Sequence, residues 1–383
     1  SGAHQWTTTF GGTGTDIGRG VAVDGAGNVH VTGYFNNTVD FGAGNVTPNG
    51  NSDVFVTKLN SSGAHQWTTT FGGTGTDTSY GVAVDGAGNV HVTGYFYNTV
   101  DFGAGNVTSN GNGDVFVTKL NSSGAHQWTT TFGGTGTDSG YGVAVDGAGN
   151  VHVAGSFVNT VDFGAGNVTS NGLADGFVTK LNSSGAHQWT TTFGGTGTDI
   201  GYWMAMDSAS NVYVTGYFRN TVDFGAGNVT SNGQADGFVT KLNSSGVHQW
   251  TTTFGGTDND IGFDVAVDGA GNVHATGYFR NTVDFGAGNV TSAGAEDAFV
   301  TKLNSSGAHQ WTTTFGGTGT DYSYGVAVDG SGNVYATGNF IGAVYFGSNI
   351  TSNGQSDVFV VKLNSAGQAA VAPGGGGGGG GGG

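Results

Sequence analysis

Cysteine is absent from this chain of 383 residues, and proline occurs only at Pro48 and Pro373. The lack of cysteine excludes disulfide bridges and thiol chemistry. Only 9% of the residues are charged, and 26 acidic against 9 basic residues give a net charge of −17. This balance disfavours nucleic acid or an anionic membrane as a partner, because both would repel the chain. No apolar run approaches the roughly 20 residues that a membrane-spanning helix needs, so membrane insertion is not expected.

The sequence contains six near-identical copies of one motif. The string HQWTTTFGG recurs every 61 residues, which places its tryptophans at Trp6, Trp67, Trp128, Trp189, Trp250 and Trp311. The sixth copy is one residue shorter, because GSNITS at 347–352 replaces GAGNVTS. Such periodicity is typical of folds in which each copy is one supersecondary unit. We therefore assign residues 1–366 to one repeat domain and residues 367–383, which end in polyglycine, to a C-terminal tail.

Each copy contains four stretches in which apolar and polar residues alternate, as in strands with one buried face. In the first copy these stretches are 20–24, 28–35, 53–59 and 65–71, and the last pattern also occurs earlier, at 4–10. Short turns at 25–27 and 60–63 predict hairpins, and the longer connection 36–52 has room for a small extra ribbon. Four antiparallel strands per copy predict an all-β, six-bladed β-propeller, because radial repetition protects the sheet edges. We expect the strand at 4–10 to complete the last blade and close the ring.

Three segments carry a resemblance to a known family: GVAVDGAGNVHVTGYF at 20–35, TVDFGAGNVTSNG at 99–111 and DGFVTKLNSSGAHQWTTTFGG at 175–195. They resemble the SBBP-type β-propeller repeats of bacterial secreted and surface proteins, and the VAVD-x-x-GNV pattern is similar to NHL-type blades. The resemblance extends over about 366 residues. It implies the propeller fold and an extracellular or cell-surface location. It implies no particular activity, since one fold hosts many functions.

Several polar positions recur in every copy, and we interpret them as structural. The segment Asp24–Asn28 and its equivalents predict hairpin turns rather than calcium sites, because each offers only two oxygen-bearing side chains. His30 and its equivalents are interpreted as packed residues rather than metal ligands, since tyrosine replaces two of them. The lysine of each copy, Lys58 in the first, is expected to pair with an aspartate such as Asp53 or Asp40.

The fifth copy contains the best metal candidate, a cluster of Asp258, Asp260 and Asp264. Calcium prefers oxygen ligands of this kind, and apart from such a calcium ion no cofactor is expected. No copy assembles a nucleophile, a base and an orienting group from different places in the sequence, as a catalytic triad requires. We therefore predict that the protein is not an enzyme.

Positions where the copies differ are the candidates for ligand binding, because the identical positions build the framework. Two residues before the first valine of the first strand, the copies carry Arg19, Tyr80, Tyr141, Tyr202, Phe263 and Tyr324. The fourth copy also has Trp203 where most copies have glycine. By analogy with other propellers this position lies beside the central opening, where aromatic rings suit stacking on sugars or gripping a peptide.

The connection between the second and third strands contains recurring N-x-Ser/Thr sequons, which are candidate glycosylation sites in an organism with that modification. They begin at Asn106, Asn167, Asn228, Asn289 and Asn349.

From these features we predict a non-catalytic extracellular or cell-surface scaffold with a structural or adhesive role, which self-assembles through its loops or tail. The alternative is a lectin-like propeller that binds carbohydrate or peptide on the face around the central opening.

Overall fold

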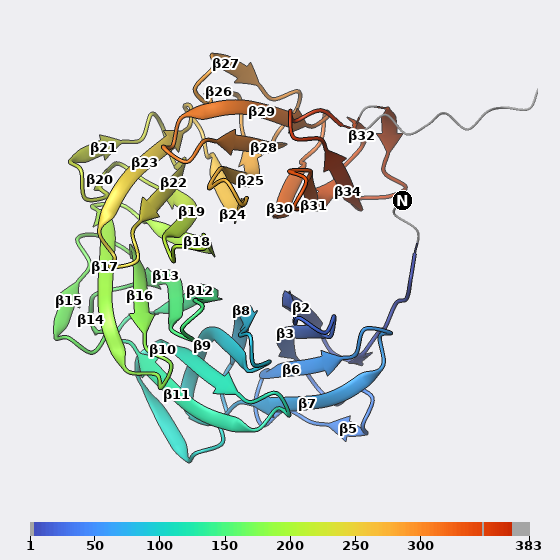
Figure 1. Cartoon of the computed structure of the whole chain (residues 1–383), viewed down its shortest axis with the longest axis vertical. Helices are drawn as coiled ribbons and strands as arrows, with labels where there is room; N and C mark the ends of the chain where they lie inside the picture. The colour runs from blue at the N-terminus through green and yellow to red at the C-terminus, as the bar shows by residue number, and fades with distance from the viewer. Residues whose placement is uncertain (1–3, 347, 370–383) are drawn as a thin grey trace, which may run out of the picture. The chain divides into compact units, whose positions relative to one another are not determined.

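The computed structural model describes residues 4–346 and 348–369 (Figure 1). The chain divides into two compact units, Ser1–Thr253 and Phe254–Gly383. All regular secondary structure in the described residues is β-strand, so the all-β prediction is confirmed. Most of the predicted tail, residues 370–383, lies outside the described residues.

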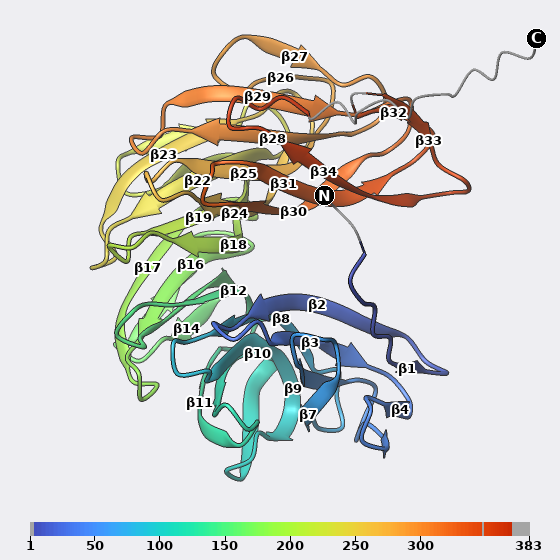
Figure 2. The same cartoon turned by 45° about the vertical axis from the view of Figure 1, so that its right-hand side comes forward.

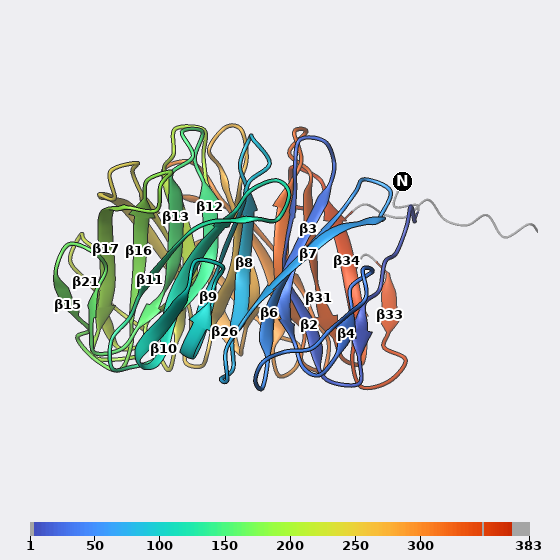
Figure 3. The same cartoon turned by 90° about the horizontal axis from the view of Figure 1, so that it is seen from below.

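The described residues of the first unit form four antiparallel sheets with the same strand order. The first sheet consists of β2 (Asp16–Val23), β3 (Val29–Phe35), β6 (Asp53–Leu59) and β7 (His65–Phe71), and the second of β8 (Thr78–Val84), β9 (Val90–Asp101), β10 (Asn106–Leu120) and β11 (His126–Phe132). The third contains β12 (Ser139–Val145), β13 (Val151–Phe157), β16 (Asp175–Leu181) and β17 (His187–Gly195), and the end of β17 also pairs with the ribbon strands β20 (Thr221–Asp223) and β21 (Asn228–Thr230). The fourth consists of β18 (Ile200–Met206), β19 (Val212–Phe218), β22 (Asp236–Leu242) and β23 (His248–Phe254). Within this unit the strands of every sheet run up and down in the view of Figure 3, between an upper and a lower set of loops.

The second unit repeats the pattern. Its first sheet consists of β24 (Ile261–Val267), β25 (Val273–Phe279), β28 (Asp297–Leu303) and β29 (His309–Phe315). Its second sheet has three strands, β30 (Tyr322–Val328), β31 (Val334–Phe340) and β34 (Asp357–Leu363). Among the described residues, five of the six sheets therefore contain the four strands predicted for each copy, and the sixth contains three of them.

The small ribbon expected in the long connection is also present. It is formed by β4 (Val39–Asp40) with β5 (Asn45–Val46), β14 (Thr160–Asp162) with β15 (Asn167–Thr169), β20 (Thr221–Asp223) with β21 (Asn228–Thr230), β26 (Thr282–Asp284) with β27 (Asn289–Thr291), and β32 (Ala343–Tyr345) with β33 (Asn349–Thr351). In the second sheet the same segment extends β9 and β10. The ribbon brings a phenylalanine onto the sheet: the Phe102 ring lies 5.3 Å from that of Phe96 and 5.2 Å from that of Phe116.

The strand expected at 4–10 is not formed among the described residues. Only β1 (Gly11–Gly12), which follows it, pairs, and its partner is β4 (Figure 2). A strand needs a hydrogen-bonding partner. By the register of the other copies that partner would be β34, at the far end of the sequence, and the described β34 pairs with β31 and, at its last residue, with Ala369.

The core lies between consecutive sheets. Val54 and Val56 on β6 are fully buried against Val82 and Val92 of the second sheet. The first strands of neighbouring sheets in the first unit, β2, β8, β12 and β18, contact one another in sequence order (Figure 1). Within each unit, consecutive sheets thus bury apolar side chains against one another, and this burial stabilises the fold.

Candidate ligand-binding site

The repeated Asp-to-Asn segments are turns closed by their own side chains. Asp24 Oδ1 accepts hydrogen bonds from the backbone N–H of Ala26 (3.0 Å) and Asn28 (2.9 Å), and its Oδ2 accepts one from Asn28 Nδ2 (2.8 Å). These bonds, above all the one from the Asn28 side chain, hold the pKa of Asp24 well below its usual range. The carboxylate is therefore occupied within the turn, in agreement with the hairpin interpretation.

The lysine of each of the first five copies forms an ion pair, but not with the expected partner. Lys58 Nζ lies 3.5 Å from Asp24 Oδ2, and Lys180 Nζ lies 3.2 Å from Asp146 Oδ2. The prediction of Asp53 or Asp40 as partner was wrong because of strand register. His30 lies directly opposite Lys58, so the lysine sits beside the turn that precedes β3, whereas Asp53 begins β6 at the opposite end of that strand.

The buried histidines belong to the same clusters. His152 is fully buried and its Nε2 lies 3.6 Å from Asp146 Oδ2. Burial, together with the charge of Lys180, lowers the pKa of His152 to about 4, so the imidazole is neutral at pH 7. In the fourth copy Tyr213 occupies this position and donates its hydroxyl to Asp207 Oδ2 at 3.0 Å. The exchange of histidine for tyrosine therefore preserves a contact with the turn aspartate.

The three aspartates of the metal candidate make separate interactions. Asp258 accepts from Asn281 Nδ2, and Asp260 accepts from the backbone N–H of Gly256 and Arg280, as its equivalents in other copies do. Asp264 accepts from the backbone N–H of Val326 at 2.8 Å, which joins β24 to β30. Among the described residues, no group of three or more histidine, aspartate or glutamate side chains is arranged to hold a metal ion.

Six of the seven predicted contact residues occupy a β-bulge, a feature that was not predicted from the sequence. The register of β2 against β3 shifts between Gly18 and Gly20, so Arg19 has no partner across the ladder. The same shift occurs at Tyr80, Tyr141, Tyr202, Phe263 and Tyr324. A bulge re-aims its side chain out of the ladder. The available signal was the glycine or serine that always precedes this position.

The bulges bring the variable side chains together within each unit. In the first unit the ring of Tyr80 lies 5.0 Å from that of Tyr141, which lies 5.3 Å from that of Tyr202. In the second unit the rings of Phe263 and Tyr324 are 5.2 Å apart. Edge and offset contacts of this kind hold aromatic side chains in fixed orientations. The predicted aromatic series therefore exists as a continuous row within the first unit.

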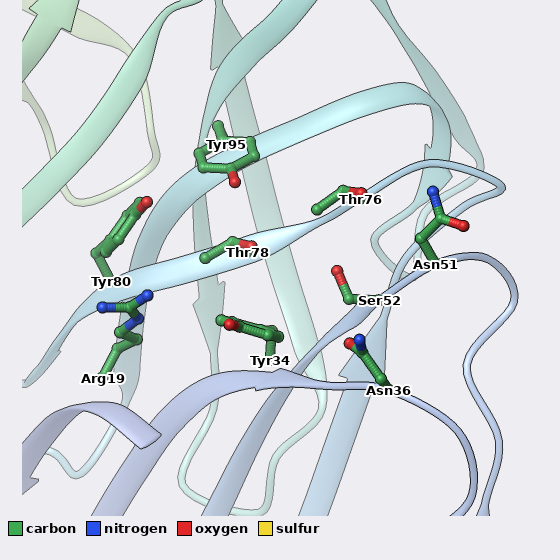
Figure 4. Close-up of a pocket in the computed structure, with 9 residues that line it drawn as sticks. All are labelled: Arg19, Tyr34, Asn36, Asn51, Ser52, Thr76, Thr78, Tyr80 and Tyr95. Atoms are coloured by element: carbon green, nitrogen blue, oxygen red, sulfur yellow. The ribbon is translucent and has the colours of Figure 1, made fainter. Parts of the chain in front are cut away.

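Arg19 begins this row and borders a pocket of about 260 Å³ between the first two sheets. The pocket is lined by Arg19, Tyr34, Asn36, Asn51, Ser52, Thr76, Thr78, Tyr80 and Tyr95 (Figure 4). Arg19 and Tyr80 stand on one side, with Asn36, Asn51 and Ser52 opposite them. Of the two predicted residues that line it, Arg19 is exposed and Tyr80 is half-buried, and burial raises the pKa of the Tyr80 hydroxyl.

Behind the pocket, hydrogen bonds join the first two sheets. Ser52 pairs with Thr76 in a parallel bridge, and the backbone N–H of Asp77 donates to the carbonyl of Ser52 at 3.0 Å. The hydroxyls of Thr32 and Ser79 lie 2.6 Å apart. These bonds fix the two pocket walls relative to each other, so the site is preformed.

Trp203, the remaining contact candidate, does not line this pocket. It is half-buried and pairs with Thr215 in the ladder of the fourth sheet. The adjacent Met204 is 4% exposed and belongs to the core. The sequon asparagines Asn106, Asn167, Asn228, Asn289 and Asn349 are all exposed, each at the start of its strand.

Five segments of the chain match the family model of the SBBP β-propeller repeat: 5–38, 66–95, 127–156, 188–217 and 310–339. An uncharacterised WD repeat-containing protein of Acanthamoeba polyphaga mimivirus is 23% identical over 350 residues, covering 71% of this chain and 25% of that protein. The regulatory protein FlaEY of Caulobacter vibrioides is 30% identical over 167 residues, covering 42% of this chain and 18% of that protein. This chain thus spans a quarter or less of the length of these relatives.

Among solved structures, hydrazine synthase of Kuenenia stuttgartiensis shares the fold with a TM-score of 0.50 and 10% identity, over 90% of this chain and 80% of that one. Identity at this level reflects architecture alone. In the described part of the chain, no helix has the length and apolar character to cross a membrane.

Proposed function

Since this chain is a β-propeller repeat protein of the SBBP family, we propose that it is a non-catalytic adhesive scaffold at the cell surface or in the extracellular space, which binds a glycan in the pocket between its first two sheets. The observation that carries the proposal is the difference between the repeated framework residues and the residues at the bulges. The recurring Asp, Asn and Lys side chains are occupied by one another in the turns, whereas the residues at the bulge differ among copies and border a preformed pocket.

The pocket lining has the chemistry of a sugar site. Three tyrosine rings offer flat apolar faces, and the amides and hydroxyls of Asn36, Asn51, Ser52, Thr76 and Thr78 offer hydrogen-bond donors and acceptors. Aromatic faces pack against the C–H faces of sugar rings while the polar groups orient the hydroxyls. The net charge of −17 disfavours nucleic acid as the ligand.

A glycan array tests the proposal when it is probed with the wild-type chain and with two single variants. We expect the wild type to bind at least one glycan, and Tyr80→Ala, which removes a pocket wall, to weaken that binding at least tenfold. Tyr345→Ala is the matched control, because Tyr345 is an exposed tyrosine outside the pocket, and it should bind as the wild type does. A wild-type protein that binds no glycan, or a Tyr80→Ala variant that binds normally, would overturn the proposal.

We further propose that the six sheets close into a six-bladed ring, with residues 4–10 as the fourth strand of the last sheet. Trp6 Nε1 donates to the Ser61 carbonyl at 3.1 Å and Thr8 Oγ1 to the Gly63 carbonyl at 2.7 Å. The fourth strand of the first sheet is held against the second sheet by the same bonds, from Trp67 to Ser122 and from Thr69 to Gly124. Residues 4–10 therefore already lie on the first sheet as the fourth strand of a preceding blade would.

Uncovered valines at the two ends of the repeat array also support closure. Val21 and Val23 on β2 are 67% and 62% exposed, and Val358 and Val360 on β34 are 77% and 75% exposed. Their equivalents in the first two sheets, such as Val54 and Val82, are buried against each other. Exposed apolar faces of this kind favour burial against a complementary surface, and each end has the complement of the other.

The same observation favours a second candidate, structural self-assembly. The face that carries Val21 and Val23 could be covered by the face that carries Val358 and Val360 of another copy, which would generate a head-to-tail array. Analytical ultracentrifugation across a hundredfold range of concentration separates the two candidates. Concentration-dependent growth in mass supports assembly, whereas a monomer at every concentration supports closure within one chain.

A further inference from the structure

The pocket contains one residue that sets it apart from its counterparts in the other copies. Five copies have an aromatic residue at the bulge, and only the first has an arginine. Arg19 is also the one charged side chain in the pocket lining. The bulge position thus carries a guanidinium only in the first copy, where the pocket is bordered by Asn36, Asn51 and Ser52.

The guanidinium is held in place by rings rather than by acids. Its central carbon lies 5.8 Å from the centroid of Tyr34 and 5.5 Å from that of Tyr80. Stacking on tyrosine faces leaves the in-plane N–H groups of an arginine available for a planar acceptor. Within the described part of the chain Arg19 forms no salt bridge, unlike Arg280, which lies 3.8 Å from Glu296.

Two buried acids adjoin the pocket lining in sequence, and both accept hydrogen bonds from the framework. Asp53, beside Ser52, accepts from the backbone N–H of Asn49 at 3.1 Å and from Asn49 Nδ2 at 3.3 Å, both on Oδ2. Asp77, between Thr76 and Thr78, accepts from the backbone N–H of Gly73 at 2.7 Å and of Tyr97 at 2.9 Å, one bond on each carboxylate oxygen. It is 1% exposed. In a chain with far more acids than bases, Arg19 therefore presents a positive charge to the pocket that the framework does not neutralise.

We propose that this pocket binds a carboxylate-bearing sugar, a uronic-acid residue of an acidic polysaccharide, and that Arg19 grips its carboxylate. The inference rests on the proposed function, because it names the class of glycan that the same pocket accepts. Arginine and carboxylate form paired, charge-assisted hydrogen bonds. The tyrosine faces and the hydroxyl and amide groups then meet the ring and its hydroxyls. A volume of about 260 Å³ suits a single sugar ring, since it lies below the roughly 300–1,000 Å³ of sites for drug-sized ligands.

A peptide C-terminus has the same charged group but fits the lining less well. Terminal carboxylates are captured by consecutive backbone N–H groups that form a nest. Here the lining residues contribute five hydroxyl- or amide-bearing side chains besides the three tyrosines, which match a polyol rather than a peptide backbone. Binding to peptides is accordingly an outcome of the test and not part of the proposal.

The test is calorimetric titration of the full chain with trigalacturonate, triguluronate and a glucuronate-containing tetrasaccharide, each beside its carboxyl-reduced form. We expect at least one acidic sugar to bind, and carboxyl reduction or Arg19→Gln each to weaken it at least tenfold. Arg19→Gln should not weaken the reduced sugar further, because the two changes remove the same contact. Arg19→Tyr, which introduces the residue of four other copies, should lose the same preference.

Arg219→Gln is the matched control, because Arg219 also stacks on a tyrosine, at 5.8 Å from the Tyr217 centroid, but lies outside the pocket lining. It should bind as the wild type does. Equal affinity for acidic and reduced sugars, with Tyr80→Ala still harmful, would overturn the inference and leave the proposed function standing. Binding of carboxylate-terminated peptides alone, or of no sugar at millimolar concentration, would overturn both.

Discussion

At the scale of single residues, the framework depends on half-buried charged side chains that pair with one another. The turn aspartate accepts from its own asparagine and pairs with a lysine, and a buried histidine or tyrosine completes the cluster. The composition predicted that lysine would be paired, but not with which aspartate, because the partner depends on the strand register. The alternation of His152 with Tyr213 between copies was a readable signal of packing. The acceptor of the Tyr213 hydroxyl was not readable.

The buried histidines make stability depend on pH. The pKa of His152 is about 4 in the folded chain and about 6.5 when unfolded. The unfolded state therefore binds more protons between these values, and stability is lost as the pH falls through 6.5 towards 4. His152→Tyr removes this loss. Relative to the wild type, the variant should gain roughly 1–2 kcal/mol between pH 7 and pH 5, measured by urea unfolding at both values.

The buried acids do not disturb this comparison. Burial raises the pKa of Asp77, Asp138 and Asp199 to about 6, so their contribution is present at low pH and is lost as the pH rises through 6. These groups are common to both proteins and cancel in the difference. An identical difference at pH 7 and pH 5 would show that His152 is not held neutral by its surroundings.

At the scale of elements, a tryptophan of the fourth strand ties the first, second and fifth sheets to a turn 54 or 55 residues later in the sequence. Trp128 Nε1 donates to the Ser183 carbonyl at 3.1 Å, and the ring lies over Gly185. Gly185 has φ +85°, and a Cβ there would lie 2.8 Å from Trp128 Cε3. The 61-residue spacing located this tryptophan, but its partner is 55 residues away on another sheet, and a pattern within one strand does not specify such a contact.

Substituting Gly185 tests this contact. Gly185→Ala should destabilise the chain by roughly 1–3 kcal/mol. The methyl group would clash with the Trp128 ring, and alanine disfavours the positive φ of this position. Gly147→Ala is the control in the turn of the same sheet, since a methyl group on Gly147 would have no other atom within 4 Å; it should change stability by less than about 0.5 kcal/mol. Equal effects in urea unfolding would mean that the tryptophan does not rest on this turn.

Strand positions were the most predictable part of the fold, and the bulges the least. The strands β6 and β7 begin and end as expected, since alternation of apolar residues locates a half-buried strand. The bulge at Arg19 leaves that alternation almost unchanged. The sequence therefore identified Arg19 as a variable residue but did not predict that it lies at a bulge. The pocket combines residues from five separate segments of two sheets. Only Arg19 and Tyr80 were identified beforehand. Asn36, Asn51, Ser52 and Thr76 lie in connections, where no strand pattern marks them. Variation among the copies at Tyr34, Tyr95 and Thr78 was a readable signal, since serine or asparagine replaces the tyrosine in two copies and isoleucine replaces the threonine in three.

At the scale of the whole molecule, ring closure predicts a specific cross-link. The side-chain oxygens of Thr57 and Thr68 are 2.6 Å apart across β6 and β7, and Val361 and Thr7 are the equivalent residues in the last copy and at the N-terminus. Because the chain has no cysteine, Thr7→Cys with Val361→Cys should form one disulfide within a monomer upon oxidation. Gel mobility under non-reducing conditions reports it.

The outcomes of the cross-link separate three arrangements. A faster-migrating monomer supports closure, and a ladder of covalent oligomers supports head-to-tail assembly. A chain that stays reduced would mean that the segment after β34, which begins with the pairing of Leu363 and Ala369, occupies that edge instead. Thr7→Cys with Asn349→Cys, which lies on the ribbon, is the control and should remain unlinked.

We infer that this protein binds its ligand in the divergent pocket rather than on the repeated framework. The most direct measurement is a crystal structure of the chain with the tightest-binding acidic oligosaccharide from the titrations. We expect one sugar ring between the side chains of Tyr34, Tyr80 and Tyr95, with its carboxylate bound to Arg19. A sugar bound instead beside Trp203, or equivalently on every sheet, would contradict it.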